Sequence, residues 1–233
     1  MGCRRSRLAG RSGSHKSLIT QAGPTTGPIP YNRCPGFSRS HAVLLHSFFV
    51  TPNNRKVEAF IKHFDLDVEI HQVNFRERET QTDEFYAMNP MRKVPVLVDG
   101  DFVIWESNAI ITYLATVFPE TGMLPTDPQG RADVDRWLHW QSCHLMPAMG
   151  ALKLSDEKDF DAIMPLLEIL DAHLQDQQFV CGDLTVVDFA IAAYTLTKLG
   201  RKMDYSGMPH AAAWRDRVSQ LKGFVATQVK VPA

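Results

Sequence analysis

The chain has 233 residues, which allows one or two domains, and its apolar fraction of 44% is enough to build a sizeable hydrophobic core. Its net charge of -1 gives no reason to expect a nucleic acid as a partner. The longest apolar stretch, near residues 189–196, is too short to span a bilayer, so we expect no transmembrane segment.

Residues 1–40 differ in composition from the rest of the chain. They carry seven basic residues and no Asp or Glu, while the remainder holds 18 basic and 26 acidic groups. The seven are Arg4, Arg5, Arg7, Arg11, Lys16, Arg33 and Arg39. Because this segment is rich in Ser, Gly and Pro and has no apolar periodicity, we expect a disordered basic extension.

Several interpretations of this extension stay open. One is that it results from an upstream start codon or is a dispensable tail. Another is an organellar transit peptide, which its Arg- and Ser-rich composition also fits. The opening Met-Gly-Cys-Arg-Arg-Ser matches the N-myristoylation pattern too, with Cys3 available for a second acyl chain. The apolar core of a secretory signal peptide is missing.

The four cysteines are Cys3, Cys34, Cys143 and Cys181. They form no C-x-x-C pair, and no spacing of Cys and His predicts a zinc site. We therefore expect free thiols, a reducing compartment and no metal.

The first ordered elements alternate between strand and helix. Residues 42–48 predict a buried strand, and apolar residues at helical spacing between 57 and 64 predict a helix. Between them, residues 51–54 read Thr-Pro-Asn-Asn, in which a capping hydroxyl is followed by proline in the first helical turn. Alternation at 68–71 indicates a half-exposed strand, and a short helix is expected near 83–88.

A hairpin and a third helix complete this part. The apolar runs 94–98 and 102–105 flank Asp-Gly-Asp, which is a hairpin turn signal. From Glu106 onward, apolar residues recur at helical spacing. The order of strand, helix, strand, helix, hairpin and helix predicts a small mixed sheet with helices packed on it.

Residues 120–129 are rich in proline and glycine and predict a linker between residues 41–119 and 130–233. Beyond it we find no strand signal. Helices are expected around 134–145, 163–174, 186–199 and 214–221, and the third is apolar nearly all round, so it should be central and buried. The fold class is therefore a mixed α/β domain followed by an all-α domain.

The junction at residues 51–54 is a candidate site for thiol chemistry. Thioredoxin-like redox proteins carry a C-P-x-C pair at such a junction, but Thr51 and Asn54 fill both cysteine positions here. This site therefore cannot run a dithiol cycle of its own. It can still stabilise the thiolate of a ligand, through the helix N-terminus and a donated hydrogen bond. Taken alone, Thr51 is equally well explained as a helix cap.

A second block carries a family resemblance. Residues 89–98 read Asn-Pro-Met-Arg-Lys-Val-Pro-Val-Leu-Val, and after the hairpin 105–108 read Trp-Glu-Ser-Asn. This resembles the glutathione S-transferases, whose pattern is N-P-x-x-K-V-P, a hairpin, then E-S and a helix. The resemblance spans about residues 42–230 and implies a thioredoxin-like glutathione-binding domain at 41–119, a helical domain at 130–233, detoxification, a cytoplasmic location and a homodimer. The basic extension adds an organellar location as the alternative.

The resemblance assigns roles to the residues of this block. It implies a cis bond before Pro95, which lets Val94 pair its backbone N–H and C=O with an extended peptide. It implies that Ser107, at a helix N-terminus, holds the γ-glutamyl carboxylate of glutathione with help from Glu106. Lys93 would face the glycine end of the tripeptide.

Thr51 and Asn53 are similar to the residues with which a bacterial-like branch of the family hydrogen-bonds the glutathione sulfur. That branch is associated with disulfide-bond reduction as well as conjugation. Ser47 is the rival hydroxyl. Two positions depart from the family: Arg92 replaces a small residue, and Thr80 falls near where other members place a His or Gln that contacts glutathione.

Two further features lie in the helical part. Thr185 and Asp188 are spaced as a capping box for the buried helix, so we expect them to be structural. The second substrate's pocket would lie between the domains, and each candidate for its lining is also explained as a core or interface residue. The candidates are Phe49, Trp140, His144 and Met149.

The expected function is therefore conjugation of reduced glutathione, as co-substrate, to a small electrophile. Two alternatives use the same fold. One is a glutathione-dependent disulfide reductase or peroxidase, and the other is a non-catalytic binding protein.

Overall fold

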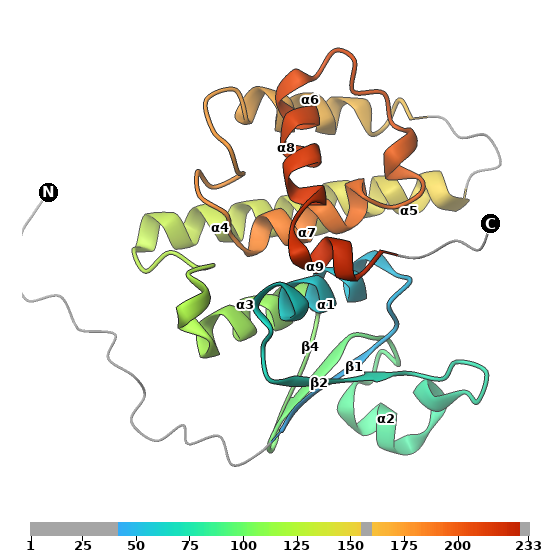
Figure 1. The fold of residues 1–233 in the computed structure, drawn as a ribbon. Helices are drawn as coiled ribbons and strands as arrows, with labels where there is room; N and C mark the ends of the chain where they lie inside the picture. Colours follow the sequence, from blue (N-terminus) through green and yellow to red (C-terminus); the bar gives the residue numbers. More distant parts are fainter. Residues whose placement is uncertain (1–41, 155–159, 229–233) are drawn as a thin grey trace, which may run out of the picture. The chain divides into compact units, whose positions relative to one another are not determined.

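The structure is a computed structural model that describes residues 42–154 and 160–228 (Figure 1). The expectations for the basic extension, including disorder, import and acylation at Cys3, lie outside these residues, as does Cys34. Within the described ranges, Cys143 and Cys181 are free thiols, as expected.

The strands of the described residues form one mixed sheet. They are β1 (Val43–Ser47), β2 (Val68–Gln72), β3 (Val96–Asp99) and β4 (Phe102–Trp105). Their order is β2-β1-β3-β4, with β2 parallel to β1, β3 antiparallel to β1 and β4 antiparallel to β3. The third strand was expected from residue 94 but begins at Val96, after Pro95, which has no N–H for the ladder.

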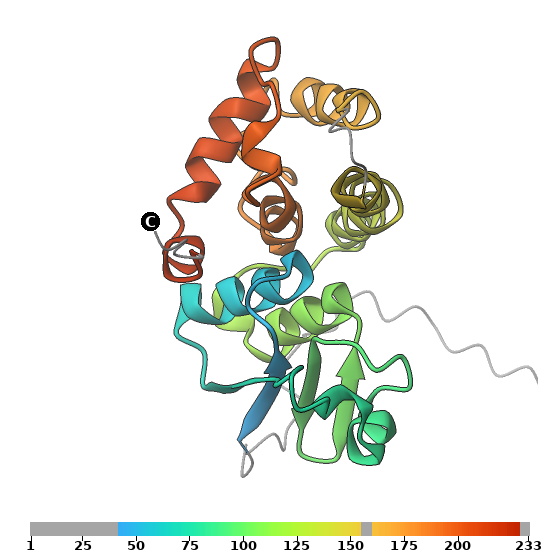
Figure 2. The same ribbon diagram turned by 90° about the vertical axis from the view of Figure 1, so that its right-hand side faces the viewer.

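Helices cover both faces of this sheet (Figures 1 and 2). Helices α1 (Pro52–Phe64) and α3 (Ser107–Val117) pack on the face to which Leu45 and Leu97 point. Helix α2 (Asp83–Met88) packs on the opposite face, where Phe85 joins Val96 in a smaller apolar cluster. Short 3-10 turns at Glu79–Gln81 and Pro119–Thr121 complete this half.

After residue 122 the described chain is helical, with only isolated bridges between residues 179 and 183. One long run contains α4 (Pro128–Trp140), a π-helical segment (Gln141–Leu145) and α5 (Met146–Leu154). The remaining elements are α6 (Met164–His173), α7 (Val186–Thr195), a 3-10 turn (Gly200–Lys202), α8 (Pro209–Ser219) and α9 (Lys222–Ala226).

The end of α7 and the presence of α9 differ from expectation. Helix α7 ends at Thr195 rather than near Leu199, and the turn after it is tight, because a Cβ on Gly200 would lie 2.4 Å from the Thr195 carbonyl oxygen. Helix α9 was not expected at all. Its five residues are too few to show an apolar period, and it is placed by packing against α1.

The two halves meet along α1. This helix packs against α7 and α9 on one side and against α3 and the sheet on the other (Figure 2). Every residue of α7 is buried, which confirms the prediction of a central helix. None of the helices in residues 42–154 and 160–228 is both long and apolar enough to cross a membrane.

The expected capping box at the start of α7 is confirmed. Asp188, fully buried, accepts the backbone N–H of Thr185 at 2.9 Å, and the Thr185 hydroxyl accepts the N–H of Val187 at 3.3 Å. Asp188 also accepts hydrogen bonds from the N–H of Val180 at 3.0 Å and from the indole N–H of Trp214 at 2.8 Å. The carboxylate therefore ties α7 to the preceding loop and to α8.

Candidate functional site

Thr51 stands at the junction of β1 and α1, with an extended backbone that makes it the N-cap residue of the helix. Its side chain caps no helical N–H in the described structure. The Thr51 hydroxyl oxygen instead accepts a hydrogen bond from the side-chain amide of Asn54. A hydroxyl has one proton to donate, so accepting this bond leaves the Thr51 proton available for a further acceptor.

Asn54 is the residue that holds this junction together. It is 1% exposed, and its Oδ1 accepts the Ser47 hydroxyl and the Phe48 N–H, each at 3.1 Å. Its Nδ2 donates to Thr51 and, at 3.4 Å, to the carbonyl of Val94. Sequence reasoning identified Asn54 only as a replaced cysteine. That position in the C-P-x-C frame was nevertheless the signal that placed it at the site.

Ser47 lies fully buried at the end of β1. Its hydroxyl is 2.6 Å from the carboxylate of Glu58 and 3.1 Å from Asn54. The rival hydroxyl is therefore directed into the protein, among polar groups of α1, while Thr51 is only partly buried.

Asn53 is held by the helical half of the chain. The hydroxyl of Tyr194 donates to its Oδ1 at 2.8 Å, and its Nδ2 lies 3.8 Å from the sulfur of Met146. Burial raises the pKa of Tyr194, which keeps this phenol protonated as the donor. Tyr194 and Met146 were not identified from the sequence, because their separation from Asn53 gives no local pattern.

The segment that precedes β3 has the backbone that the resemblance implies. The Val94–Pro95 peptide bond is cis, and the Val94 carbonyl is the one that Asn54 contacts. Lys93 is exposed, and its carbonyl accepts a 2.7 Å bond from the side chain of Asn89.

Both departures from the family pattern lie beside this segment. Arg92 has a positive φ of 53°, and its guanidinium donates to the carbonyls of Thr80 at 3.4 Å and Thr82 at 3.1 Å. Thr80 itself is only 3% exposed, and its hydroxyl accepts a 3.2 Å hydrogen bond from the side chain of Gln81. Arg92 ties the turn to the residues at the start of α2.

Glu106 and Ser107 begin α3. Glu106 is exposed and has a φ of 74°, a conformation that is rare for a residue with a side chain and that clusters at ligand-binding positions. Ser107 is the first residue of the helix and is 6% exposed. The helix N-terminus here offers backbone N–H groups to an anion.

A buried lysine supports this helix start from behind. The Lys56 ammonium donates to Oδ1 of Asn108 at 2.6 Å and to Oε1 of Gln141 at 3.1 Å. Asn108 in turn donates to Gln141 and to the carbonyl of Leu138. Burial lowers the pKa of Lys56 to about 7, and Glu106 opposes this shift. The sequence placed Lys56 on the first helix but gave no sign that it is buried.

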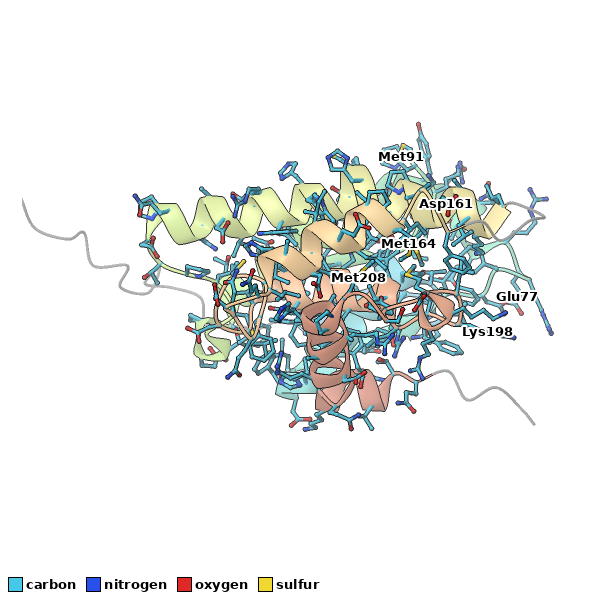
Figure 3. All side chains as sticks on the ribbon, turned by 90° about the horizontal axis from the view of Figure 1, so that it is seen from above. Glu77, Met91, Asp161, Met164, Lys198 and Met208 are labelled. Atoms are coloured by element: carbon cyan, nitrogen blue, oxygen red, sulfur yellow. The ribbon has the colours of Figure 1, made fainter. Side chains whose placement is uncertain are left out.

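A cavity of about 410 Å³ lies beside Thr51, with Val50 and Pro52 in its wall. Its remaining lining comes from α1, from α7 with the turn after it, and from the end of the described chain; these residues are Arg55, Ala193, Leu196, Thr197, Lys198, Arg201 and Gln228. Figure 3 shows the side chains from above, with Lys198 labelled.

The four residues expected to line the second-substrate pocket are not in the wall of this cavity. Phe49 is 43% exposed on the loop after β1, and His144 is exposed in the π-helical segment. Trp140 is half-buried against Trp137, with ring centroids 5.1 Å apart. Met149 is 5% exposed and packs in the core.

Comparison with known proteins identifies the family. The family model of the glutathione S-transferase N-terminal domain matches residues 42–116, and that of the C-terminal domain matches residues 140–222. Glutathione S-transferase D7 of Drosophila melanogaster is 31% identical over 181 residues, which are 73% of this chain and 81% of that protein. Glutathione S-transferase theta-1 of Rattus norvegicus is 31% identical over 194 residues, 72% of this chain and 79% of that one.

Solved structures of glutathione transferases have a similar fold. A possible glutathione S-transferase from Rhodopseudomonas palustris superposes with a TM-score of 0.71 at 26% identity, over 82% of this chain and 100% of that chain. A glutathione transferase of Bombyx mori superposes with a TM-score of 0.73 at 24% identity, over 81% and 97%, which bears on the fold alone. Since both halves match family models and the relatives align with most of the chain, the protein belongs to the glutathione S-transferase family.

Proposed function

We propose that this protein binds reduced glutathione, stabilises its thiolate at Thr51 and Asn53, and conjugates it to a small electrophile. The observation that carries the proposal is the hydroxyl of Thr51, which stands at the N-terminus of α1 with its proton free to donate. A thiolate placed there gains the positive end of the helix and a hydrogen bond.

The peptide would be held by groups on two neighbouring elements. We infer that glutathione lies extended beside the cis Val94–Pro95 bond, with its γ-glutamyl carboxylate at Ser107 and Glu106 and its glycine end toward Lys93. Asn54 supports this arrangement because it contacts both Thr51 and the Val94 carbonyl. This contact of Asn54 with both residues fixes the position of the sulfur site relative to the peptide site.

In the reaction, the glutathione sulfur supplies the nucleophile and the protein supplies position and charge. The thiol loses its proton to solvent when the bound thiolate forms. The sulfur then bonds to the electrophilic carbon of the second substrate, while the bond from that carbon to its leaving group breaks and the leaving group departs with the electron pair. Hydrogen bonds from Thr51 and from Nδ2 of Asn53 would favour the thiolate over the thiol. The protein forms no covalent intermediate in this scheme.

Two sets of residues are candidates for the lining of the second-substrate pocket. One is the expected set of Phe49, Trp140, His144 and Met149. The other is the cavity that contains Val50 and Pro52, whose apolar lining is joined by the cations of Arg55, Lys198 and Arg201. We propose the cavity as the principal pocket, because the residues on either side of Thr51 are part of its wall. Filling it with Lys198→Trp, at an exposed residue of its wall, should raise KM for the electrophile but not for glutathione.

We also propose the finer features that the family resemblance implies. These are a Thr-Pro-Asn active-site branch, a homodimer and a cytoplasmic location. From the composition of the chain we further propose organellar import as the alternative location, and a boundary region at residues 120–129 between domains at 41–119 and 130–233. The proposed conjugation needs no metal ion.

The test compares two assays on the purified full chain: glutathione conjugation to a generic aromatic electrophile, and glutathione-dependent reduction of a mixed disulfide. Conjugation that saturates with glutathione supports the proposal. Ser107→Ala should raise KM for glutathione, while Ser206→Ala, at an exposed serine, should not. Disulfide reduction without conjugation would favour the reductase, and tight glutathione binding without either activity would favour a binding protein.

A further inference from the structure

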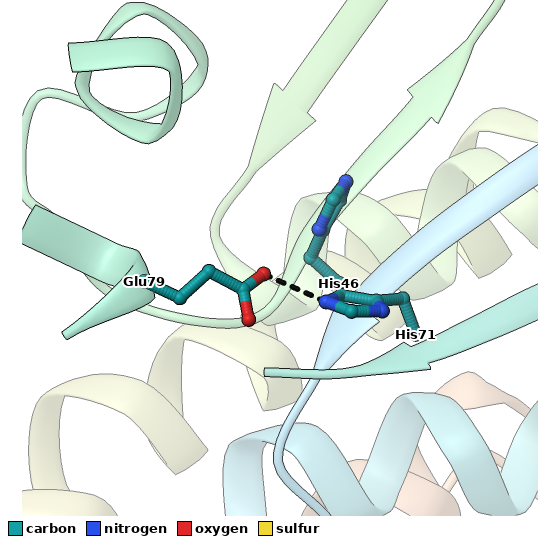
Figure 4. Close-up of side chains that lie close together, drawn as sticks. All are labelled: His46, His71 and Glu79. Carbon is teal, nitrogen blue, oxygen red and sulfur yellow. Dashed lines mark hydrogen bonds and ion pairs between the residues drawn. The ribbon is translucent and has the colours of Figure 1, made fainter. Parts of the chain in front are cut away.

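Three potential metal ligands meet on the α2 face of the sheet, away from the α1 junction. They are His46 of β1, His71 of β2 and Glu79 of the turn before α2 (Figure 4). We propose that these three side chains form a binding site for a divalent transition cation of the zinc type.

The fold places the two histidines side by side. His46 and His71 are partners in the parallel register of β1 and β2, so their side chains leave the sheet on the same face. Their ring centroids are 5.3 Å apart, in an edge-to-face arrangement. The pair is therefore fixed by backbone pairing in the sheet, and a metal would find two imidazoles already close together.

A loop that is closed by hydrogen bonds holds Glu79 beside the two histidines. One carboxylate oxygen lies 2.7 Å from Nε2 of His71, and the other accepts the backbone N–H of Asn74 at 2.8 Å. The backbone N–H of Glu79 donates to the Asn74 carbonyl at 3.2 Å, which closes the loop a second time. The contact from Asn74 is the kind of supporting hydrogen bond that orients a carboxylate ligand.

The geometry is close to what a tetrahedral ion needs. The three ligand atoms lie within 4.8 Å of one another, whereas ligands at zinc-bond length stand about 3.3 Å apart. The side chains of His71 and Glu79 are 44% and 28% exposed, so they have room to close on an ion. Two histidines and one carboxylate leave a fourth position for water, a familiar zinc arrangement.

An unsatisfied atom points to the same conclusion. Nδ1 of His46 is buried and finds no hydrogen-bond partner among the described residues. A buried polar nitrogen without a partner is uncommon in a folded protein and needs an explanation. One ring nitrogen of His46 on the metal and a small reorientation of the ring would resolve it.

The proposal uses none of the residues that we place at the glutathione site, and it does not depend on glutathione chemistry. Its physical effect would be to join β1, β2 and the start of the following turn. Thr80 comes directly after Glu79, and its carbonyl accepts a bond from Arg92. A bound ion would therefore hold the connection between β2 and α2 against the sheet.

The experiment is a calorimetric zinc titration of the full chain. Bound metal is first removed with a chelator, and the chelator is then removed from the protein. Wild type should bind one equivalent that His71→Ala loses and that Glu79→Gln binds about tenfold or more weakly. His139→Ala is the matched control, because His139 is an exposed histidine on α4. Selective changes in the ring nitrogen resonances of His46 and His71 on titration should locate the ion.

The variants must remain folded for this comparison, so circular dichroism and glutathione-dependent turnover without metal should match wild type. Zinc should raise the melting temperature of wild type and of His139→Ala, but not that of His71→Ala. Equal stoichiometry and affinity in wild type, His71→Ala and Glu79→Gln would overturn the proposal, leaving His71 and Glu79 as a surface ion pair. Unchanged ring nitrogen resonances at saturating zinc would overturn it as well.

Discussion

The hydroxyl of Tyr194 donates a 2.8 Å hydrogen bond to the side-chain oxygen of Asn53, and so links α7 to the first turn of α1. This bond fixes which end of the Asn53 amide carries the donors. Because the oxygen is occupied by Tyr194, the NH₂ group turns toward Met146. The helical half therefore orients a residue that we place in the sulfur site.

The first prediction concerns Tyr194→Phe. Losing the phenol leaves the Asn53 amide free to rotate, so turnover should fall by about tenfold, less than removal of a catalytic donor would cost. The free energy of unfolding should fall by about 1 kcal/mol. Steady-state kinetics and denaturant unfolding measure both. Tyr205→Phe is the control, since its buried hydroxyl donates to the sulfur of Met203 and not to Asn53. Equal turnover in Tyr194→Phe and Tyr205→Phe would show that the orientation of Asn53 does not affect catalysis.

The second prediction concerns the buried ammonium of Lys56, whose pKa is lowered by burial to about 7. The unfolded chain keeps this proton up to the ordinary lysine pKa, so it binds more protons than the folded chain above pH 7. Stability then rises with pH in this window. Relative to Lys56→Met, wild type should gain about 1 kcal/mol per pH unit between pH 7.5 and 9.5.

Chemical unfolding at several pH values measures this difference. Lys62→Met is the matched control on the same helix, where the side chain is only partly buried, and it should keep the pH dependence of wild type. A stability difference between wild type and Lys56→Met that stays constant with pH would mean that Lys56 is charged in the folded protein throughout this range.

Local signals were enough to predict the frame of this site. The Thr-Pro pair marks the start of α1, the Asp-Gly-Asp turn marks the hairpin, and Thr185 with Asp188 marks the start of α7. Each depends on residues that are close together in the chain. Backbone preference and capping act over a few residues, so they are visible in the sequence.

Contacts between distant segments were not predictable in this way. Lys56 on α1 contacts Asn108 on α3 and Gln141 in the π-helical segment. Nothing in the local sequence distinguishes a buried lysine from an exposed one on α1. The pairing of His46 with His71 depends on strand register, which the sequence of either strand does not specify. The lining of the second-substrate pocket likewise depends on how the helices pack.

The third prediction concerns Asp188→Ala. The substitution removes the acceptor for three N–H groups, those of Val180, Thr185 and Trp214. Buried donors left without a partner cost more than a lost surface cap, so the free energy of unfolding should fall by about 3 kcal/mol or more. Denaturant midpoints measure the change. Asp183→Ala, at an exposed aspartate in the same loop, should be nearly neutral. Glutathione affinity of the folded fraction should be unchanged, and a midpoint equal to that of wild type would contradict the role of Asp188.

The last prediction concerns the sulfur itself. If Thr51 donates its proton to bound glutathione, the pKa of the bound thiol should lie below that of free glutathione. A shift of about two units corresponds to about 2.7 kcal/mol of preference for the thiolate. Thr51→Ala should raise this pKa and slow turnover, while glutathione affinity changes less, because the peptide is held at Val94 and Ser107. Thr51→Ser keeps the hydroxyl and should keep most of the activity.

Thiolate absorbance of bound glutathione, followed against pH in wild type and the two variants, measures the effect directly. Thr116→Ala removes an exposed helical hydroxyl on α3 and should titrate like wild type. The serine variant separates chemistry from folding, because any loss through packing of the Thr51 methyl group appears in it too. If Thr51→Ala also titrates like wild type, the thiolate is held by Asn53 and the N–H groups at the start of α1, and Thr51 serves only to begin the helix.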